Sequence, residues 1–200
     1  QPLAARTVFS NFFRHLRHPL LWPAMLVGGL NFLVFVNLYT FLTFRLSAAP
    51  WNLGATALGL LFLTYLGGTL SAALSARFSA RSQTGGMALG VGIMLSGCLL
   101  TLTSQLPLIL LGLTINAFGF FLTHSLANAW VNQHAEGAKA SATSLYSVGY
   151  YLGAAVGIYY LQPFWYWANW PGVIAAAILV LLVNSGLIRR LHNRAAKRIS

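Results

Sequence analysis

Charged side chains are scarce in this sequence, and acidic ones are almost absent. Of 200 residues, 12 are Lys or Arg and 1 is Asp or Glu, so 6% of the chain is charged while 58% is hydrophobic. A water-soluble domain carries about a quarter of its residues as charged side chains, because its surface must be hydrated. This composition excludes a soluble globular protein, including a soluble enzyme, and predicts a chain whose solvent is largely lipid.

Cysteine is equally scarce, and the motifs of common catalytic and metal sites do not occur. The one cysteine, Cys98, lies in an apolar run, which excludes a disulfide framework and a cysteine-based zinc site. Neither Gly-x-Ser-x-Gly nor His-Glu-x-x-His is present. His124 and Ser125 are adjacent in sequence, which points their side chains in different directions. We therefore predict no enzyme activity, no cofactor and no metal ion.

Long apolar stretches are what the sequence does contain, and six of them are long enough to cross a bilayer. About 20 helical residues span about 30 Å of hydrocarbon. We predict an all-α integral membrane protein with a transmembrane domain over 20–188, between a basic segment (1–19) and a basic tail (189–200). The six predicted spans are 20–44, 53–76, 85–104, 106–130, 142–161 and 171–187. The 7 prolines support this division, because all fall in predicted connections or first turns.

Basic residues predict how the chain lies in the membrane. If six helices alternate in direction, every Lys and Arg except Arg45 falls on one side. An excess of basic residues marks the cytoplasmic side, so we expect both termini in the cytoplasm. The net charge of +11 is then an anchor at the lipid headgroups and not a nucleic-acid surface, since the cations form short clusters between long uncharged stretches. For Arg45 we expect a headgroup contact, and for Glu136 a solvated pair with Lys139.

Small residues recur at four-residue intervals and predict close helix packing. Gly149, Gly153 and Gly157 form such a stripe on the fifth span, and Gly67 begins one on the second. Lipid gives helices no hydrophobic drive to associate, so small residues help them to approach closely. Stripes of this kind are common in membrane proteins and predict a helix bundle, not a substrate.

A short internal echo predicts a repeat. Tyr65-Leu66-Gly67-Gly68 on the second span is matched by Tyr151-Leu152-Gly153-Ala154 on the fifth. If the six spans are two triplets, these are the middle helices of each, and they run in opposite directions. The pattern favours an inverted repeat of three plus three helices, an arrangement common in secondary transporters.

Polar groups on the fourth span are the first candidates for a functional site. Asn116, Phe120, His124 and Asn128 follow one another at four-residue intervals, which predicts a common helix face. This face could line a substrate path with His124 as a hydrogen-bonding or titratable group. The alternative is that it holds the bundle together through interhelical hydrogen bonds, but for the whole stripe we favour the cavity. Further candidates for a cavity are Asn31, Tyr65, Tyr146 and Tyr150.

Three segments together resemble a known family. The run Gly119-Phe120-Phe121-x-x-His124-Ser125-x-Ala127-x-x-Trp130-Val131 resembles the tenth helix of bacterial major facilitator superfamily transporters of the YnfM inner-membrane type. Ala142-Thr143-Ser144-Leu145-Tyr146, followed by Tyr150-Tyr151-Leu152-Gly153, looks like their eleventh helix, and Phe44-Arg45-Leu46 with Ala48-Ala49-Pro50 is similar to the stretch after their seventh. The resemblance runs from about Phe12 to Leu191. One departure is the loop signature after the eighth helix, which in the superfamily reads like Gly-x-x-x-Asp-Arg-x-Gly-Arg. Its aspartate and both glycines are missing from Ala72 to Arg81.

The resemblance implies a twelve-helix fold in two halves, of which this chain is expected to be the C-terminal one. A first residue other than Met is what a fragment would have. Alternating access against an N-terminal six-helix half would move a small solute across the bacterial inner membrane, with proton-coupled efflux of a drug or metabolite as the expected form. In that reading Asn116, His124 and Asn128 contact solute, with Tyr146 and Tyr150 opposite them.

Ion coupling would need a group that this chain does not supply, because no carboxylate lies within a predicted span. A coupling acid would therefore belong to the other half. Two alternatives stay open, namely a self-contained six-helix permease or channel that acts as a homo-oligomer, and a membrane scaffold that transports nothing.

Overall fold

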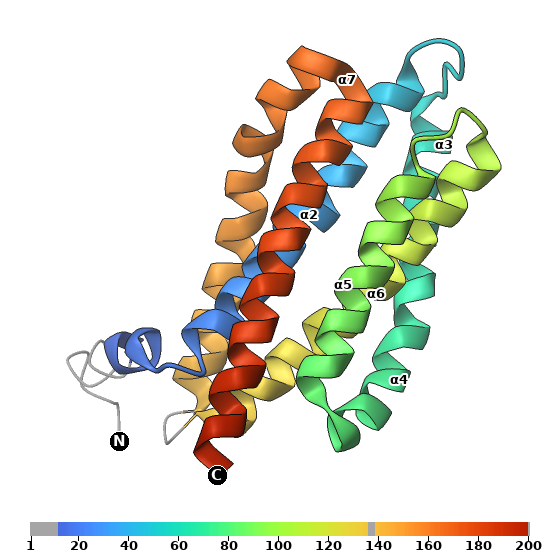
Figure 1. Cartoon of the computed structure of the whole chain (residues 1–200). Helices are drawn as coiled ribbons and strands as arrows, with labels where there is room; N and C mark the ends of the chain where they lie inside the picture. The colour runs from blue at the N-terminus through green and yellow to red at the C-terminus, as the bar shows by residue number, and fades with distance from the viewer. Residues whose placement is uncertain (1–11, 136–138, 200) are drawn as a thin grey trace, which may run out of the picture.

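Helices account for nearly all of the chain that the structure describes. The computed structural model describes residues 12–135 and 139–199, and these contain no strand. After a short helix over 12–17, the elements are α2 (Trp22–Ser47), α3 (Ala55–Leu60), the 3-10 helix η1 (Leu61–Tyr65), α4 (Leu66–Arg81), α5 (Gln83–Leu100), α6 (Leu106–His134) and α7 (Lys139–Ile199). Successive helices run in opposite directions, so the described chain begins and ends at the same end of the bundle (Figure 1).

The second helical rod is built from three elements without a break. The backbone passes from α3 through η1 into α4, and the tighter 3-10 turn carries a hydrogen bond from Thr64 Oγ1 to the Leu61 carbonyl at 2.6 Å. Short 3-10 segments commonly link or distort α-helices. Residues 55–79 together are long and apolar enough to cross a membrane.

The last two predicted spans form one element with a kink. The helical conformation of α7 is interrupted only at Ala168 and at Asn169, which has a positive φ of 49°. Asparagine tolerates positive φ better than most residues. The kink divides α7 into a first part (139–167) and a second part (170–199). The first part extends beyond the predicted end at residue 161. Pro163 lies inside the helix, whereas the sequence had suggested that it lies in a connection.

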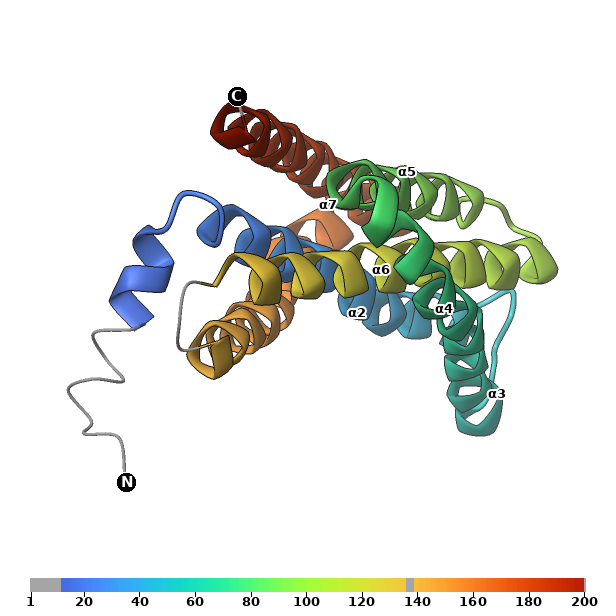
Figure 2. The ribbon, with the colours of Figure 1, turned by 90° about the horizontal axis from the view of Figure 1, so that it is seen from below.

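Two central helices hold the bundle together. α2 and α6 lie in the middle, α4 and α5 pack against α6, and α7 packs against α2 (Figure 2). A Cβ at Gly153 of α7 would overlap the Gly29 carbonyl of α2, and one at Gly67 of α4 would lie 2.6 Å from Thr114 Cγ2 of α6. Each middle helix thus packs against the first helix of the other triplet. That reciprocal packing is what an inverted repeat produces.

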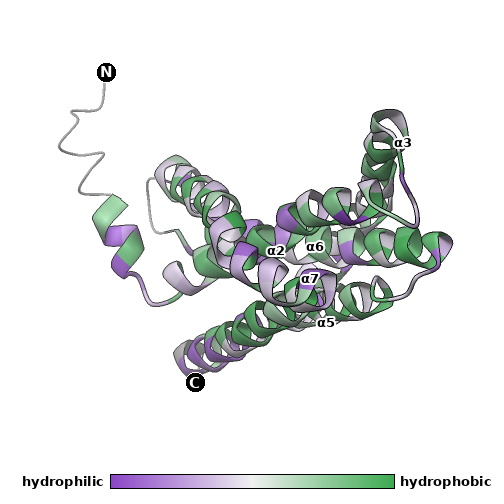
Figure 3. Ribbon diagram, turned by 90° about the horizontal axis from the view of Figure 1, so that it is seen from above, coloured by the Kyte–Doolittle hydropathy of each residue, from purple (hydrophilic) through white to green (hydrophobic). Residues whose placement is uncertain are grey.

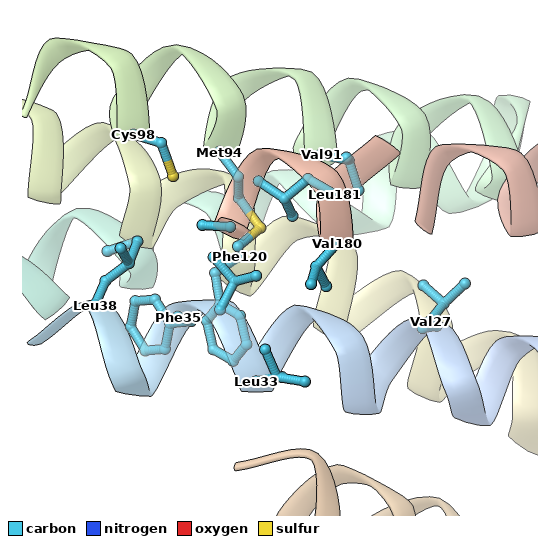
Figure 4. Packing of buried hydrophobic residues seen from close by; sticks show 14 of the residues in the cluster. Val27, Leu33, Phe35, Leu38, Val91, Met94, Cys98, Phe120, Val180 and Leu181 are labelled. Atoms are coloured by element: carbon cyan, nitrogen blue, oxygen red, sulfur yellow. The ribbon is translucent and has the colours of Figure 1, made fainter. Parts of the chain in front are cut away.

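The hydrophobic core lies where α2, α5, α6 and α7 meet. Phe35 from α2, Met94 from α5 and Phe120 from α6 are buried there and lie close together with Leu181 from α7 (Figure 4). On the outside, by contrast, α3 has no buried residue, and large apolar side chains such as Leu66 and Leu70 are about two-thirds exposed. Apolar surface on this scale does not suit water.

A membrane accounts for that surface. Five helical stretches, with α7 counted once, are long and apolar enough to cross a bilayer. At 1.5 Å per residue α7 is roughly three bilayer thicknesses long, so its two parts on either side of the kink provide two crossings. The chain is an all-α, multi-pass membrane protein. The hydropathy colouring shows hydrophilic residues gathered on the C-terminal part of α7 (Figure 3).

The basic residues within the spanning bundle are divided unequally between its two ends. Arg77 and Arg81 lie in the last turns of α4 and Lys139 begins α7, at the end of the bundle where α7 also ends (Figure 1). We call this the basic end. Arg45 in the last turn of α2 lies at the opposite end. Glu136 lies outside the described residues.

Candidate functional site

Aromatic rings from three helices stack into one continuous group inside the bundle. Phe35 of α2 lies parallel to Phe120 of α6 at 3.9 Å between ring centroids, and Phe32 of α2 lies nearly parallel to Tyr150 of α7 at 3.8 Å. Such pairs contribute beyond the area they bury. We call the following residues the aromatic cluster: Phe32, Phe35, Phe120, His124, Tyr146 and Tyr150.

His124 is the polar centre of the aromatic cluster. Its Nδ1 lies 2.9 Å from the Tyr146 hydroxyl in a hydrogen bond whose donor depends on the imidazole tautomer. The imidazole ring lies 4.8 Å from the Tyr150 ring and 5.8 Å from the Phe120 ring. Tyr146 is 2% exposed, whereas His124 and Tyr150 are half-buried and keep part of their surface open.

A glycine on α2 makes room for Tyr146. A Cβ at Gly28 would lie 2.6 Å from the Tyr146 hydroxyl oxygen, so the phenol ring crosses α2 where that helix has no side chain. The tyrosine therefore reaches from α7 past α2 to the histidine on α6. Gly28 was not among the candidates from the sequence.

Tyr65 joins the aromatic cluster at its edge, from η1. Its ring lies 4.9 Å from Phe35 and 4.8 Å from Tyr39. Next to it, the hydroxyl groups of Thr64 and Tyr39 share a hydrogen bond of 2.7 Å. The second helical rod is therefore tied to α2 beside the cluster.

The predicted polar stripe of α6 divides between different neighbours. Asn116 is fully buried, and its Nδ2 donates to the Met94 carbonyl at 3.1 Å and to Cys98 Sγ at 3.3 Å, so it faces α5. Asn128 accepts from Asn132 of its own helix. Four residues advance an α-helix by 40° beyond a full turn, so the stripe rotates along the helix. Only Phe120 and His124 of the stripe lie in the aromatic cluster.

Asn31 also lies apart from the aromatic cluster, in a buried amide pair. Asn184 Nδ2 of α7 donates to Asn31 Oδ1 at 2.7 Å and to the Val27 carbonyl at 3.3 Å, and both asparagines are fully buried. Asn184 was missed in the sequence, although a lone amide in an apolar span was the signal that could have found it.

The glycine stripe of α7 lies along α2. Gly153 faces the Gly29 carbonyl, and Gly157 faces the side chains of Leu33 and Asn37. The close approach lets Asn37 Nδ2 donate to the Ala154 carbonyl at 3.0 Å. Gly149 is more open, because a Cβ there would meet only the Met25 carbonyl oxygen at 3.9 Å.

Two members of the aromatic cluster were not foreseen, namely Phe32 and Phe35 of α2. Their spacing of three residues, followed by Tyr39 four residues further on, was visible in the sequence. Such spacing is, however, as typical of an ordinary packed helix face as of a site. Only the positions of Phe120 and Tyr150 across the bundle give these rings a shared role.

Arg45 has protein partners that the sequence did not indicate. Its Nη1 and Nη2 donate to the carbonyls of Thr101 and Thr103 at 2.6 and 2.8 Å, in the connection between α5 and α6. Its guanidinium carbon lies 4.8 Å from the Trp51 ring, and Trp170 Nε1 donates to the same Thr101 carbonyl at 3.0 Å. Arginine is suited to such a forked contact.

The side chains of the aromatic cluster are suited to binding a small molecule. Within residues 12–135 and 139–199, no three His, Cys, Asp or Glu side chains lie close enough to hold a metal ion. Half-open aromatic faces attract planar apolar groups and cations, and His124 adds a hydrogen-bonding atom. This combination of apolar walls and one polar group is typical of small-molecule sites.

Comparison with known proteins finds relatives that are all about twice as long. The inner membrane transport protein YnfM of Escherichia coli K12 is 37% identical over 95% of this chain and 47% of its own length. The uncharacterized MFS-type transporter YybF of Bacillus subtilis 168 is 31% identical over 92% of this chain and 46% of its own. An uncharacterized transporter of Buchnera aphidicola from Schizaphis graminum is 31% identical over 86% of this chain and 42% of its own. No protein-family model matches. The chain thus spans about half the length of these relatives.

Proposed function

Because the chain belongs to the major facilitator superfamily and matches one half of its relatives, we propose that it forms the C-terminal half of a transporter and moves a small solute by alternating access. The aromatic cluster would be its contribution to the solute path. The observation that carries this proposal is the half-open His124–Tyr150 face, in a chain whose relatives are named as transporters.

The chemistry of the aromatic cluster favours one class of solute. Phe32 and Tyr150 are only partly buried and offer ring faces, and the described residues carry no carboxylate to bind a cation by direct charge. A planar aromatic cation would be held by stacking and by the quadrupoles of the rings, at about 0.5–2 kcal/mol for each cation–π contact. Efflux of such a drug or metabolite suits a site that recognises shape and polarisability.

The charged residues of the chain bear on two further parts of the proposal, namely proton coupling and orientation in the membrane. A proton-coupled cycle would need an acid from the N-terminal six-helix half, since the only acidic residue in the sequence, Glu136, lies outside the predicted spans. The basic end would face the cytoplasm of a bacterial cell, with both termini on that side. Asn116 and Asn31 would then stabilise the bundle from within, away from the solute.

Ethidium efflux by the full-length protein tests the proposal in cells that lack their major drug exporters. The variants are His124→Ala and Tyr150→Ala, and Ser125→Ala is the control because it lies next to His124 and outside the aromatic cluster. We expect Tyr150→Ala to raise the half-saturating concentration roughly two- to thirtyfold, which is the range of one cation–π contact.

Two results would contradict the proposal. Equal efflux by His124→Ala, Tyr150→Ala and Ser125→Ala at matched expression would return the aromatic cluster to a packing role. Solute movement by the purified 200-residue chain alone in liposomes would support the homo-oligomeric permease instead. Movement of no solute by the full-length protein would support the scaffold.

A further inference from the structure

A long apolar groove lies between α2 and the first part of α7, away from the aromatic cluster. It has a volume of about 510 Å³ and follows α2 from Trp22 to Leu33 and α7 from Leu145 to Val156. No member of the aromatic cluster lines it. At the rise of an α-helix the α2 side is about 16 Å long, close to half of a bilayer core about 30 Å thick. The groove therefore has the length of one leaflet.

The lining of the groove restricts what can lie in it. Every residue that lines it is apolar, from Leu26 and Leu30 on α2 to Leu152 and Val156 on α7. An extended hydrocarbon chain suits such a lining.

Positive charge gathers where the groove reaches the basic end. Trp22 lines the groove, and its ring lies 5.8 Å from the guanidinium carbon of Arg190 and 5.9 Å from that of Arg194. Arg194 also donates to the Pro19 carbonyl at 3.1 Å. Both arginines line a depression of about 280 Å³ on the second part of α7. No carboxylate side chain among the described residues offsets their charge.

We propose that one anionic phospholipid of the leaflet at the basic end binds here, with its phosphate at Arg190 and Arg194 and one acyl chain in the groove. The arginines complement the phosphate charge, and Trp22 lies between head and tail at the depth where membrane proteins place tryptophan. Gly149 and Gly153 form the floor of the groove on α7. This assignment is independent of the solute.

Lipid binding to the purified chain in detergent tests the head of the site. Native mass spectrometry would compare phosphatidylglycerol with phosphatidylcholine of the same acyl chains. The variant R190Q/R194Q is matched by R77Q/R81Q, which removes the same charge at the same spacing from α4 at the same end. We expect a one-to-one phosphatidylglycerol complex with the native chain and with R77Q/R81Q, and at least tenfold weaker binding by R190Q/R194Q.

A second pair of variants tests the tail. Gly149→Leu would place a side chain in the groove, because Gly149 lines the groove and the nearest atom to an added Cβ is 3.9 Å away. Gly92→Leu on α5 makes the same change where nothing lies within 4 Å. We expect severalfold weaker phosphatidylglycerol binding with Gly149→Leu alone, and circular dichroism would verify that both variants are folded.

Several outcomes would overturn the assignment. Equal binding of both lipids would mean that the site does not recognise the anionic headgroup. Equal loss of binding in R190Q/R194Q and R77Q/R81Q would mean that only the net charge of the protein matters. If soluble glycerol phosphate competed fully with phosphatidylglycerol and Gly149→Leu had no effect, the arginines would bind a phosphate but the groove would not bind an acyl chain. Val148→Cys reports a protein occupant, because Val148 is 60% exposed and the native Cys98 is buried. A disulfide between two copies, or a cross-link to the other half, would mean that protein covers the groove.

Discussion

The approach of α7 to α2 at Gly153 leads to a quantitative prediction for Gly153→Ala. An added Cβ would overlap the carbonyl oxygen of Gly29 and would lie 2.6 Å from its carbonyl carbon. The obstacle is backbone, so no change of side-chain rotamer can relieve it, and the helices must move apart by roughly 1 Å. Overpacking of this kind costs about 1–3 kcal/mol, and the separation also weakens dispersion contacts along the seam.

Gly92→Ala is the matched control for this prediction. Gly92 lies within a helix, as Gly153 does, but a Cβ there meets nothing within 4 Å. Replacing glycine by alanine favours the helix by roughly 0.5–1 kcal/mol at either site, so this term cancels in the comparison. We expect Gly153→Ala to have the lower free energy of unfolding, by about 1–3 kcal/mol relative to Gly92→Ala.

Unfolding by sodium dodecyl sulfate in mixed micelles, followed by circular dichroism at helical wavelengths, measures the difference. The hydrogen bond from Asn37 to the Ala154 carbonyl should weaken in the same variant, because it depends on the same approach. Equal stability of Gly153→Ala and Gly92→Ala would refute the reasoning. It would mean that α2 and α7 are not held at contact distance by their glycines.

Two further predictions concern buried polar groups. Asn184→Leu leaves Asn31 Oδ1 without its donor in a fully buried position, so we expect a loss of about 1–3 kcal/mol in the same unfolding assay. The double variant N31L/N184L should recover part of this loss, and a simple sum of the two single effects would show that the amides do not interact. Arg45→Lys keeps the charge but loses the fork, so amide hydrogen exchange in the connection between α5 and α6 should become faster. Unchanged exchange there would show that the fork does not hold this connection.

Hydropathy alone was enough to predict the fold class. Long apolar stretches can satisfy their backbone in lipid only as helices, which is why an all-α membrane protein followed directly from the sequence. The kink in α7 was harder to foresee. Pro163 removes one helical hydrogen bond and was interpreted as part of a connection, yet the helix continues through it until Ala168 and Asn169. Interior proline is common in membrane helices, so proline marks their ends poorly.

The grouping of the candidate side chains was predicted in part, and the differences have physical reasons. His124, Phe120, Tyr146 and Tyr150 were all chosen from the sequence, and the structure brings them together. Asn116 was assigned to the same face, but two helical turns rotate it by about 80° relative to His124, toward α5.

Contacts between distant segments could not be read from the pattern at all. The fork of Arg45 reaches carbonyls 56 and 58 residues away in sequence, and the bond between Asn184 and Asn31 spans 153 residues. Residues on an entirely apolar helix show no periodic contrast that would reveal which side faces a partner.

The Thr101 carbonyl links three segments of the chain at the end of the bundle that lies opposite the basic end. One oxygen accepts from Arg45 at the end of α2 and from Trp170 just after the kink of α7. A shift of the connection between α5 and α6 would therefore strain both hydrogen bonds together. The end of α2, the connection between α5 and α6, and the start of the second part of α7 thus meet at one carbonyl oxygen. We expect these three segments to move together when this end of the bundle opens.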